Sequence, residues 1–546
     1  MLFFTTVIMQ SVLSSSSEFH RDEEDGNLDK KNNNWSPSFY FVPKNHTVPH
    51  SDAQDDQTYD DLVRPFFHEL QSALRHYREM ADRIIRQLSI SHEVALRTEH
   101  LLFPHHHSRI IATCNEQRSS SILLSCKLEQ KIAASARLLE HNCDVLEILL
   151  KSFPVIAISP QNNITTTSSS NVTFPLPSCD SNQNITESLQ RPMQSLARYI
   201  PPYTNSSHIV NEQFEEEPYD SATHVITHLS RDWTENGESI RQDTYDWIVD
   251  QLCNYNDYFH DESDTKCVSP LSPVLVPGAG LARLAFDIAF VNNRNDTNGR
   301  QMKECNPFIV EAVDNSVVMA AAAYHVLHHA ANRRTDDTAL LTVYPFVSDP
   351  LMNEVDTQRR WESADFPEEK ITKIIDRLAL QHSYHKPNLS YVIGDFVSLY
   401  ASPSKHGMYG SIATCYFIDT ATNIYEYILT IRNLLRVGGI WINLGPVQWH
   451  RNAQLQPSTD ELKDMILLAG FTIIHWEISD KLLAYRHPQD ILSGTRVEAY
   501  RPLKFVVVLG SNGNDVQDET AETPHDDLFS SLQKLHQVTG RKTSMV

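Results

Sequence analysis

The sequence predicts an α/β fold: a doubly wound, mostly parallel sheet preceded by an N-terminal helical domain. From Leu275 onward, short apolar runs alternate with amphipathic stretches in the order strand, helix, strand. That order builds parallel sheets whose faces are covered by helices. Between 61 and 153, in contrast, apolar residues recur every three or four positions, which is the helical period.

Composition divides the 546-residue chain into five segments. A chain of this length exceeds one ordinary core, so we expect two domains with linkers. Polar low-complexity runs and acidic stretches separate the patterned regions and are typical of linkers and disorder. The expected segments are a disordered N-terminal segment (1–60), a helical domain (61–153), a low-complexity linker or insertion (154–215), an α/β domain (216–510) and a disordered acidic tail (511–546).

The helical segments are predicted from apolar residues that fall on one helix face. They are Phe66, Leu70, Leu74 and Tyr77, followed by the spans Ile122–Leu150 and Tyr219–Leu252. In the α/β domain the expected strands are Leu275–Pro277, Phe308–Val313, Tyr391–Ile393, Ile412–Phe417, Ile440–Leu444 and Phe505–Leu509. The expected helices between them are Leu281–Ile288, Val317–His328, Ile424–Leu435 and Thr459–Leu468. Ligands of such sheets bind outside the carboxyl ends of the strands.

Charge and cysteine content narrow the class of partner. A net charge of −23 argues against a general binder of nucleic acid but leaves a small cationic substrate open.

The eight cysteines form no C-x-x-C pair and are too sparse for a disulfide scaffold, so we expect a reducing compartment and no metal site. No apolar run reaches the roughly 18 residues of a membrane span. We expect a cytoplasmic protein with nuclear entry as an option, and leave a homodimer open.

One mildly apolar stretch, Met1–Leu13, lies at the N-terminus. It lacks the basic residues with which a signal peptide begins, so we do not expect it to direct secretion.

A glycine turn follows the first expected strand of the α/β domain. Gly278 and Gly280 lie one residue apart, directly before an amphipathic helix. Without side chains they let the backbone approach a ligand, and the free N–H groups of the helix start favour electron-rich atoms. Arg283 stands where a dinucleotide fingerprint has its third glycine, so that fingerprint fails. A tight turn without a ligand is the plain alternative.

Acidic residues follow the next two strands. Asp314 and Glu311 lie at the close of the second strand, where an acid can hold ribose hydroxyls. Asp314 could equally cap the following helix. Asp395 and Phe396 follow the third strand and suit an adenine, through a hydrogen bond and ring stacking. A turn aspartate beside a core phenylalanine is the alternative.

The most specific stretch runs from Ala413 to Asn423. Asp419 falls after its strand, at the carboxyl end of the sheet. As an alternative it could cap the helix from Ile424, although neighbouring threonines could do so instead. His450 follows the next strand in a short polar loop, where an isolated histidine is more often simply exposed to solvent.

These motifs resemble the carnosine N-methyltransferase family, also called N2227-like. The resemblance covers roughly 60–152 and 216–510. It rests on Arg231-Asp-Trp233, Val276–Leu281, Gly394-Asp-Phe396, Ala413–Asn423, Gly438–Pro446 and Tyr500–Val508, with Phe66–Arg78 in the helical part. It implies a class I, Rossmann-like fold that uses S-adenosylmethionine as cofactor and a histidine dipeptide as small-molecule substrate.

The resemblance also implies roles for single residues. Expected at the cofactor are His228, Arg231, Gly278, Asp314, Asp395, Phe396 and Cys415, with Gly280 added from the turn itself. Expected at the substrate are Asp419, His450 and Tyr500, of which Asp419 and His450 are also the expected catalytic residues. The family usually has Gln at the place of His228. This chain departs from the family at three further places. Ala282 stands where the family has the third glycine of the turn, and Ala312-Val313-Asp314 stands where the family has Gly-Asn-Glu. Residues 292–306 form an insertion that is unusual for the family.

The leading functional reading is methyl transfer to the proximal imidazole nitrogen of carnosine, which gives anserine. The second keeps the reaction but changes the acceptor to a protein histidine or another imidazole metabolite. The third is a degenerate scaffold without activity, favoured by the departures at Ala282 and Ala312–Val313 and opposed by the retained Asp419 and His450. A dehydrogenase is the least consistent of the possible functions, because the dinucleotide-binding fingerprint fails at Arg283.

Overall fold

The computed structural model describes residues 37–41, 59–102, 124–150, 156–157, 222–256, 273–291, 305, 308–332, 341–348, 357–369, 371, 374–375, 388–487, 497 and 499–510. Predictions for Met1–Leu13, for the 511–546 tail and for most of 1–60, 154–215 and the 292–306 insertion lie outside these residues. The boundaries expected between the five segments remain predictions.

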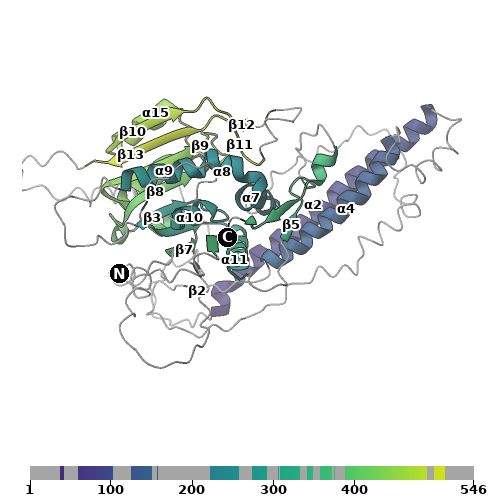
Figure 1. Ribbon diagram of the computed structural model, residues 1–546, viewed down its shortest axis with the longest axis horizontal. Helices are drawn as coiled ribbons and strands as arrows, with labels where there is room; N and C mark the ends of the chain where they lie inside the picture. Colours follow the sequence, from purple (N-terminus) through teal and green to yellow (C-terminus); the bar gives the residue numbers. More distant parts are fainter. Residues whose placement is uncertain are drawn as a thin grey trace, which may run out of the picture.

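Within the described residues, a nine-stranded sheet lies at the centre of the fold (Figure 1). Its order is β10-β13-β9-β8-β3-β4-β7-β1-β2, and among the described strands of this sheet β13 alone runs in the direction opposite to the others. The chain passes from β3 to β4 and β7 on one side, then crosses to β8 on the other. The doubly wound, mostly parallel sheet is confirmed. Its strands are β1 (Ser38–Phe41), β2 (Ile156–Ala157), β3 (Pro273–Pro277), β4 (Ile309–Asp314), β7 (Asn388–Ile393), β8 (Tyr409–Cys415), β9 (Leu435–Gly445), β10 (Phe471–Ile478) and β13 (Leu503–Leu509).

Helices cover both faces of the sheet, as alternating side chains of β3 show. Val274 and Val276 join the hydrophobic cluster under one helix layer, whereas Leu275 joins the cluster under the other. The first layer contains α7 (Ala222–Trp233), α9 (Tyr245–Asn256), α10 (Arg283–Ala289) and α11 (Val317–Asn332). The second contains α13 (Phe396–Tyr400), α14 (Ile424–Leu434) and α15 (Thr459–Leu468). The short helix α8 (Glu238–Asp243) lies between α7 and α9 in the chain.

Two long antiparallel helices form the predicted helical region. They are α2 (Tyr59–Leu102) and α4 (Leu124–Leu150), which lie side by side and extend away from the sheet at one end (Figure 1). Phe66, Leu70, Leu74 and Tyr77 are all buried, which confirms the predicted helix face. These side chains belong to the same hydrophobic cluster as β3 and α10, so the hairpin shares its core with the sheet.

Strands β1 and β2 correct the expected disorder in 1–60 and 154–215. β1 pairs in parallel with β7, and β2 pairs with β1. Phe39 of β1 is buried and stacks on Tyr391, with ring centres 5.1 Å apart. A four-residue apolar island within a polar stretch is too short to shift its average composition, which is why the prediction was wrong there.

Further differences concern elements without a clear pattern. The structure adds β10 and the short pairs β5 (Leu341–Val343) with β6 (Ala364–Phe366) and β11 (Leu483–Ala484) with β12 (Ala499–Tyr500). β8 ends at Cys415 and not at Phe417 as predicted, because Tyr416 has a φ of 52° and leaves the extended conformation.

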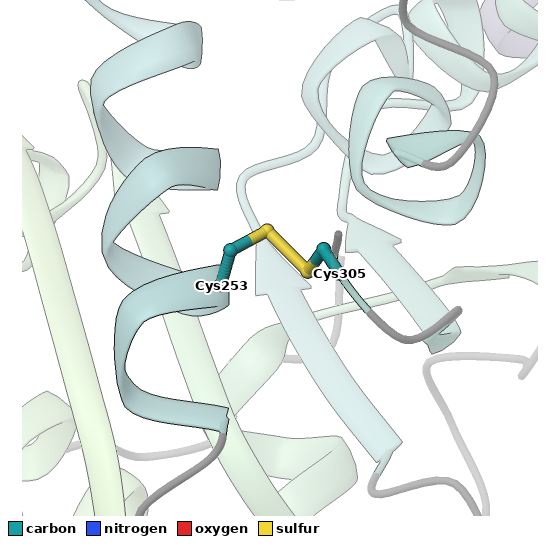
Figure 2. Close-up of a disulfide and its surroundings, with 2 residues drawn as sticks. All are labelled: Cys253 and Cys305. Carbon is teal, nitrogen blue, oxygen red and sulfur yellow. A yellow bond between two sulfur atoms is a disulfide. The ribbon is translucent and has the colours of Figure 1, made fainter. Parts of the chain in front are cut away.

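A disulfide overturns one sequence expectation. Cys253 at the end of α9 and Cys305 before β4 are bonded, 52 residues apart in the chain (Figure 2). The cysteine spacing alone does not show that α9 brings its last turn beside the start of β4. The argument for a reducing compartment from unpaired cysteines therefore fails for this pair. None of the described helices is long and apolar enough to cross a membrane.

The residue before α10 has a left-handed backbone although it is not glycine. Ala282 has a φ of 63° and is fully buried. Its N–H bonds to the carbonyl of Ala279, and its own carbonyl accepts the N–H of Phe286 in the first turn. This is the place where the resembling family has glycine, so the departure leaves local strain in the turn.

Replacing this residue by glycine tests that strain. We expect Ala282→Gly to change the free energy of unfolding by less than about 0.5 kcal/mol, because relief of the left-handed backbone offsets the lost methyl group. Ala285→Gly, at an equally buried site inside α10, should lower it by about 2 kcal/mol. Chemical denaturation of both variants measures the difference, and equal losses would show that Ala282 is unstrained.

Candidate active site

A pocket lies where the strand order reverses, between the carboxyl ends of β3 and β8. Doubly wound sheets bind their ligands at this switch point. The pocket has a volume of about 420 Å³, part of which is open to solvent. Residues from α7, α9, the glycine turn, the end of β8 and the segment after β11 line it: His228, Arg231, Tyr245, Val276, Pro277, Gly278, Ala279, Gly280, Leu284, Cys415, Tyr416 and Tyr485.

The glycine turn forms one wall of the pocket and is fixed from neighbouring strands. Gly278 has a φ of 68°, and a Cβ there would lie 2.4 Å from the Phe417 ring, so a side chain is excluded. The Gly280 N–H donates to Asp314 Oδ2 at 2.8 Å, while its carbonyl accepts from the Tyr391 hydroxyl at 2.7 Å. The turn is thus set in place by β4 and β7 before any ligand binds.

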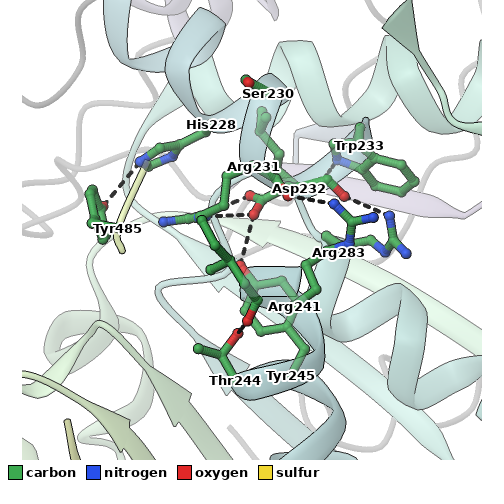
Figure 3. Close-up of polar contacts among 12 residues, drawn as sticks. His228, Ser230, Arg231, Asp232, Trp233, Arg241, Thr244, Tyr245, Arg283 and Tyr485 are labelled. Carbon is green, nitrogen blue, oxygen red and sulfur yellow. Dashed lines mark hydrogen bonds and ion pairs between the residues drawn. The ribbon is translucent and has the colours of Figure 1, made fainter. Parts of the chain in front are cut away.

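A buried ion pair on α7 forms the opposite wall (Figure 3). Arg231 donates from Nε and Nη2 to the two oxygens of Asp232, at 2.7 and 3.1 Å. Tyr245 of α9 donates its hydroxyl to Asp232 Oδ1 at 2.8 Å. Burial raises the pKa of Asp232, but the adjacent Arg231 outweighs it and holds this pKa below its ordinary value. Both residues are therefore charged, and Nη1 of Arg231 has no hydrogen-bond partner.

A second set of buried charges ties α7 to α10. Arg283 donates from Nη1 to the Asp232 carbonyl at 2.6 Å and from Nη2 to Glu368 Oε1 at 2.7 Å. Arg241 donates to Glu368 Oε2 at 2.6 Å and to the Arg231 carbonyl at 2.6 Å. Arg283, which breaks the dinucleotide fingerprint, is therefore a structural residue that fixes the wall behind the pocket.

Aromatic side chains form another part of the pocket's lining. His228 Nε2 and the Tyr485 hydroxyl are 3.1 Å apart, and burial lowers the pKa of His228 well below its ordinary value, so the imidazole is neutral. Tyr485 also packs edge-on against Tyr416 and Tyr500, with ring centres 5.0 and 6.2 Å away. Tyr485 thus joins the predicted cofactor residues to the predicted substrate residues.

Asp419 lies beyond Tyr485, in the 3₁₀ turn Ile418–Thr420 after β8. Its side chain is buried, and Oδ2 accepts from the Gln448 N–H at 3.1 Å. The Asp419 carbonyl accepts from the His450 N–H at 3.1 Å, which brings the loop after β9 against the turn after β8. Asn423, and not Asp419, caps α14 through its side chain. Burial raises the pKa of Asp419 to about 6.

The structure places the remaining predicted residues at nearby strand ends, outside the lining of the pocket. Both oxygens of Asp314 accept backbone N–H groups, from Gly280 and from Ser316. Asp395 caps α13 by accepting from the Ser398 N–H at 2.9 Å, and Phe396 packs in the core below.

The position of Glu311 contradicts the expectation that this residue lies with Asp314 at the end of the strand. It sits in the middle of β4 and accepts the hydroxyls of Tyr400 and Tyr409 on the side of the sheet away from the pocket's α7 wall. Counting residues along a predicted strand did not fix which acid would reach the carboxyl end.

Three tyrosines that line the pocket were missed by sequence reasoning: Tyr245, Tyr416 and Tyr485. Tyr416 lies inside the quoted Ala413–Asn423 motif, but was interpreted as part of the strand. Tyr485 lies 66 residues after Asp419 in a segment without periodicity, so only the fold brings the two together. No cluster of side chains suited to a metal ion occurs within the described part of the chain.

Comparison with known proteins points to one family. A family model described as carnosine N-methyltransferase matches residues 210–508. The chain is 30% identical over 226 residues to carnosine N-methyltransferase of Schizosaccharomyces pombe, an overlap of 41% of this chain and 51% of that protein. It is 28% identical over 250 residues to carnosine N-methyltransferase unmet of Drosophila melanogaster, covering 45% and 46%.

The chain spans about half the length of these curated relatives. Among solved structures, the antibiotic-resistance methyltransferase Kmr aligns at 14% identity with a TM-score of 0.25, over 44% of this chain and 87% of that one.

The raised pKa of Asp419 predicts a stability effect that depends on pH. A rise of its pKa from the ordinary 3.8 to about 6 means that ionising the Asp419 carboxyl group in the folded protein costs up to about 3 kcal/mol of stability. The protonated form carries no such cost, so stability falls as the pH rises from 3.8, where the group ionises in the unfolded chain, to about 6, where it ionises in the folded protein. We expect Asp419→Asn to be as stable as the wild type near pH 3 and more stable at pH 8.

Thermal unfolding of both proteins across this pH range measures the effect. Asp460→Asn is the control, because Asp460 is fully solvated and a hydrogen bond from Ser458 lowers its pKa. A stability gain for Asp419→Asn that does not change with pH would contradict a buried, ionisable carboxyl group.

Proposed function

Because the chain belongs to the carnosine N-methyltransferase family, we propose that it methylates the proximal imidazole nitrogen of carnosine, or of a related histidine dipeptide. Membership of the family supports methyl transfer that depends on S-adenosylmethionine as the reaction class, and the acceptor is proposed together with it. The observation that carries it is a buried carboxylate, Asp419, beside a pocket built at the switch point of the sheet.

The pocket fits the cofactor by the chemistry of its walls. Gly278 and Gly280 leave the backbone accessible, and Arg231 Nη1 is a buried cationic donor without a partner. We assign the lining residues His228, Arg231, Gly278, Gly280 and Cys415 to cofactor binding. When bound, S-adenosylmethionine supplies an electrophilic methyl group on a positively charged sulfur.

The strand ends beside the pocket would hold the nucleoside part. Each carboxylate oxygen can accept more than one hydrogen bond, so Asp314 can receive ribose hydroxyls while it keeps the N–H groups of the turn. Asp395 and Phe396 follow β7 and would contact the adenine through the carboxylate and the ring.

Asp419 would select the nitrogen that reacts. An imidazole with a pKa of about 6.5 is largely neutral at pH 7, so one of its nitrogens has a free lone pair. By accepting the N–H of the distal nitrogen, the Asp419 carboxylate fixes the tautomer in which the proximal nitrogen is unprotonated. The same carboxylate then stabilises the imidazolium product, as a buried aspartate does for a catalytic histidine.

His450 and Tyr500 would complete the acceptor site. The His450 N–H fixes this loop to Asp419, and its exposed side chain can hold the dipeptide or pass the released proton to solvent. Tyr500 packs edge-on against Tyr485, so the acceptor ring would lie beside two aromatic side chains that exclude water.

The proposal is tested by methyl transfer to carnosine from labelled S-adenosylmethionine. We expect the wild type to be active and Asp419→Asn to lose at least a hundredfold in turnover, because an amide cannot stabilise the imidazolium. Cofactor affinity, measured by calorimetry, should stay unchanged, because Asp419 lies outside the lining of the cofactor pocket. Asp460→Asn, an exposed site on α15, is the matched control and should keep full activity.

Each contrary outcome has a distinct meaning. Near-normal turnover of Asp419→Asn would remove its catalytic role. Labelling of proteins in a lysate, without labelling of free carnosine, would move the acceptor to protein histidine. A wild type that does not bind the cofactor would favour a scaffold without activity.

A further inference from the structure

Tyr416 has the most unusual backbone among the residues that line the pocket. Its φ of 52° is left-handed, although a tyrosine side chain disfavours that region. The backbone of β9 holds it there, because the Tyr416 N–H donates to the Leu444 carbonyl at 3.0 Å. Gly445 permits the close approach of the β9 backbone to Tyr416, since a Cβ on Gly445 would lie 3.0 Å from the Tyr416 nitrogen. Strained residues of this kind cluster at ligand sites.

The hydroxyl of Tyr416 is buried and has no hydrogen-bond partner. Its ring packs edge-on against Tyr485 and lies 5.5 Å from the Arg231 guanidinium carbon. Burial raises the pKa of Tyr416 well above its ordinary value, so the phenol stays protonated and can donate. A buried hydroxyl without a partner is costly, and a ligand that supplies an acceptor would remove that cost.

Arg231 presents a second donor of the same kind to the same pocket. Its Nε and Nη2 are used by Asp232, and Nη1 is buried without a partner. A guanidinium N–H and a phenol O–H from two residues that line one pocket match the two oxygens of a carboxylate. S-adenosylmethionine has one anionic group, the carboxylate of its methionine part.

We propose that the Tyr416 hydroxyl binds this carboxylate together with Arg231 Nη1, which makes Tyr416 a further cofactor-binding residue. The inference rests on the proposed cofactor. A dipeptide acceptor also has a carboxylate, but Tyr416 and Arg231 line the pocket with Gly278 and Gly280. Asp419 and His450, the proposed acceptor residues, lie outside that lining, so the cofactor is the source that the geometry favours.

Calorimetric binding to the full chain tests this assignment without turnover. The probes are S-adenosylhomocysteine, which has the carboxylate, and methylthioadenosine, which keeps the nucleoside and sulfur but lacks it. We expect Tyr416→Phe to weaken S-adenosylhomocysteine binding about tenfold or more, as for a hydrogen bond to a charged group, and to leave methylthioadenosine binding unchanged. Phenylalanine fits the same space, so the variant should fold, and thermal unfolding checks this.

Tyr425→Phe is the matched control, because Tyr425 is 38% exposed on α14 and should affect neither ligand. An unchanged affinity of Tyr416→Phe for S-adenosylhomocysteine, or an equal loss for both probes, would overturn the inference alone. A raised KM for carnosine with unchanged S-adenosylhomocysteine binding would assign Tyr416 to the acceptor and also overturn it. A wild type that does not bind S-adenosylhomocysteine would overturn the proposed function, and this inference with it.

Discussion

The buried ion pair between Arg231 and Asp232 is the contact on which the pocket depends. Asp232 accepts three donors from two helices, α7 and α9, and its carbonyl accepts a fourth from Arg283 of α10. Removing one partner of such a pair leaves a buried charge uncompensated, which typically costs about 3–5 kcal/mol. The pair therefore fixes three helices around the glycine turn and, at the same time, leaves one guanidinium nitrogen for a ligand.

The environment of Asp419, the proposed acceptor residue, differs from that of the ion pair. Asp419 has two backbone contacts with the loop after β9, and burial outweighs these contacts and the nearby His450, so the pKa of its carboxyl group stays raised. A group held with a raised pKa beside a pocket is typical of catalytic sites. Tyr485 interacts electrostatically with Arg231 and with Asp419, so one aromatic residue lies near both the proposed cofactor site and the proposed acceptor site.

Patterns repeated over many residues were predictable from the sequence, and contacts between distant segments were not. The strands β3, β4, β7, β8, β9 and β13, the helix face around Phe66 and the position of the pocket at the switch point follow from periodicity and strand order. Tyr485 and the Cys253–Cys305 bond depend on segments that only the fold brings together. The left-handed Tyr416 could not be foreseen either, because its conformation depends on a hydrogen bond to Leu444 of the neighbouring strand and on the close approach that Gly445 permits.

The orientation of the acceptor is the central claim, since it links Asp419 to the chemistry. Its most direct test is the position of the new methyl group, read by NMR from carnosine treated with the wild-type protein and S-adenosylmethionine carrying a ¹³C-methyl group. Methylation of the proximal nitrogen alone is the predicted result, because Asp419 would hold the N–H of the distal one. Methylation of the distal nitrogen, or of both, would contradict this account.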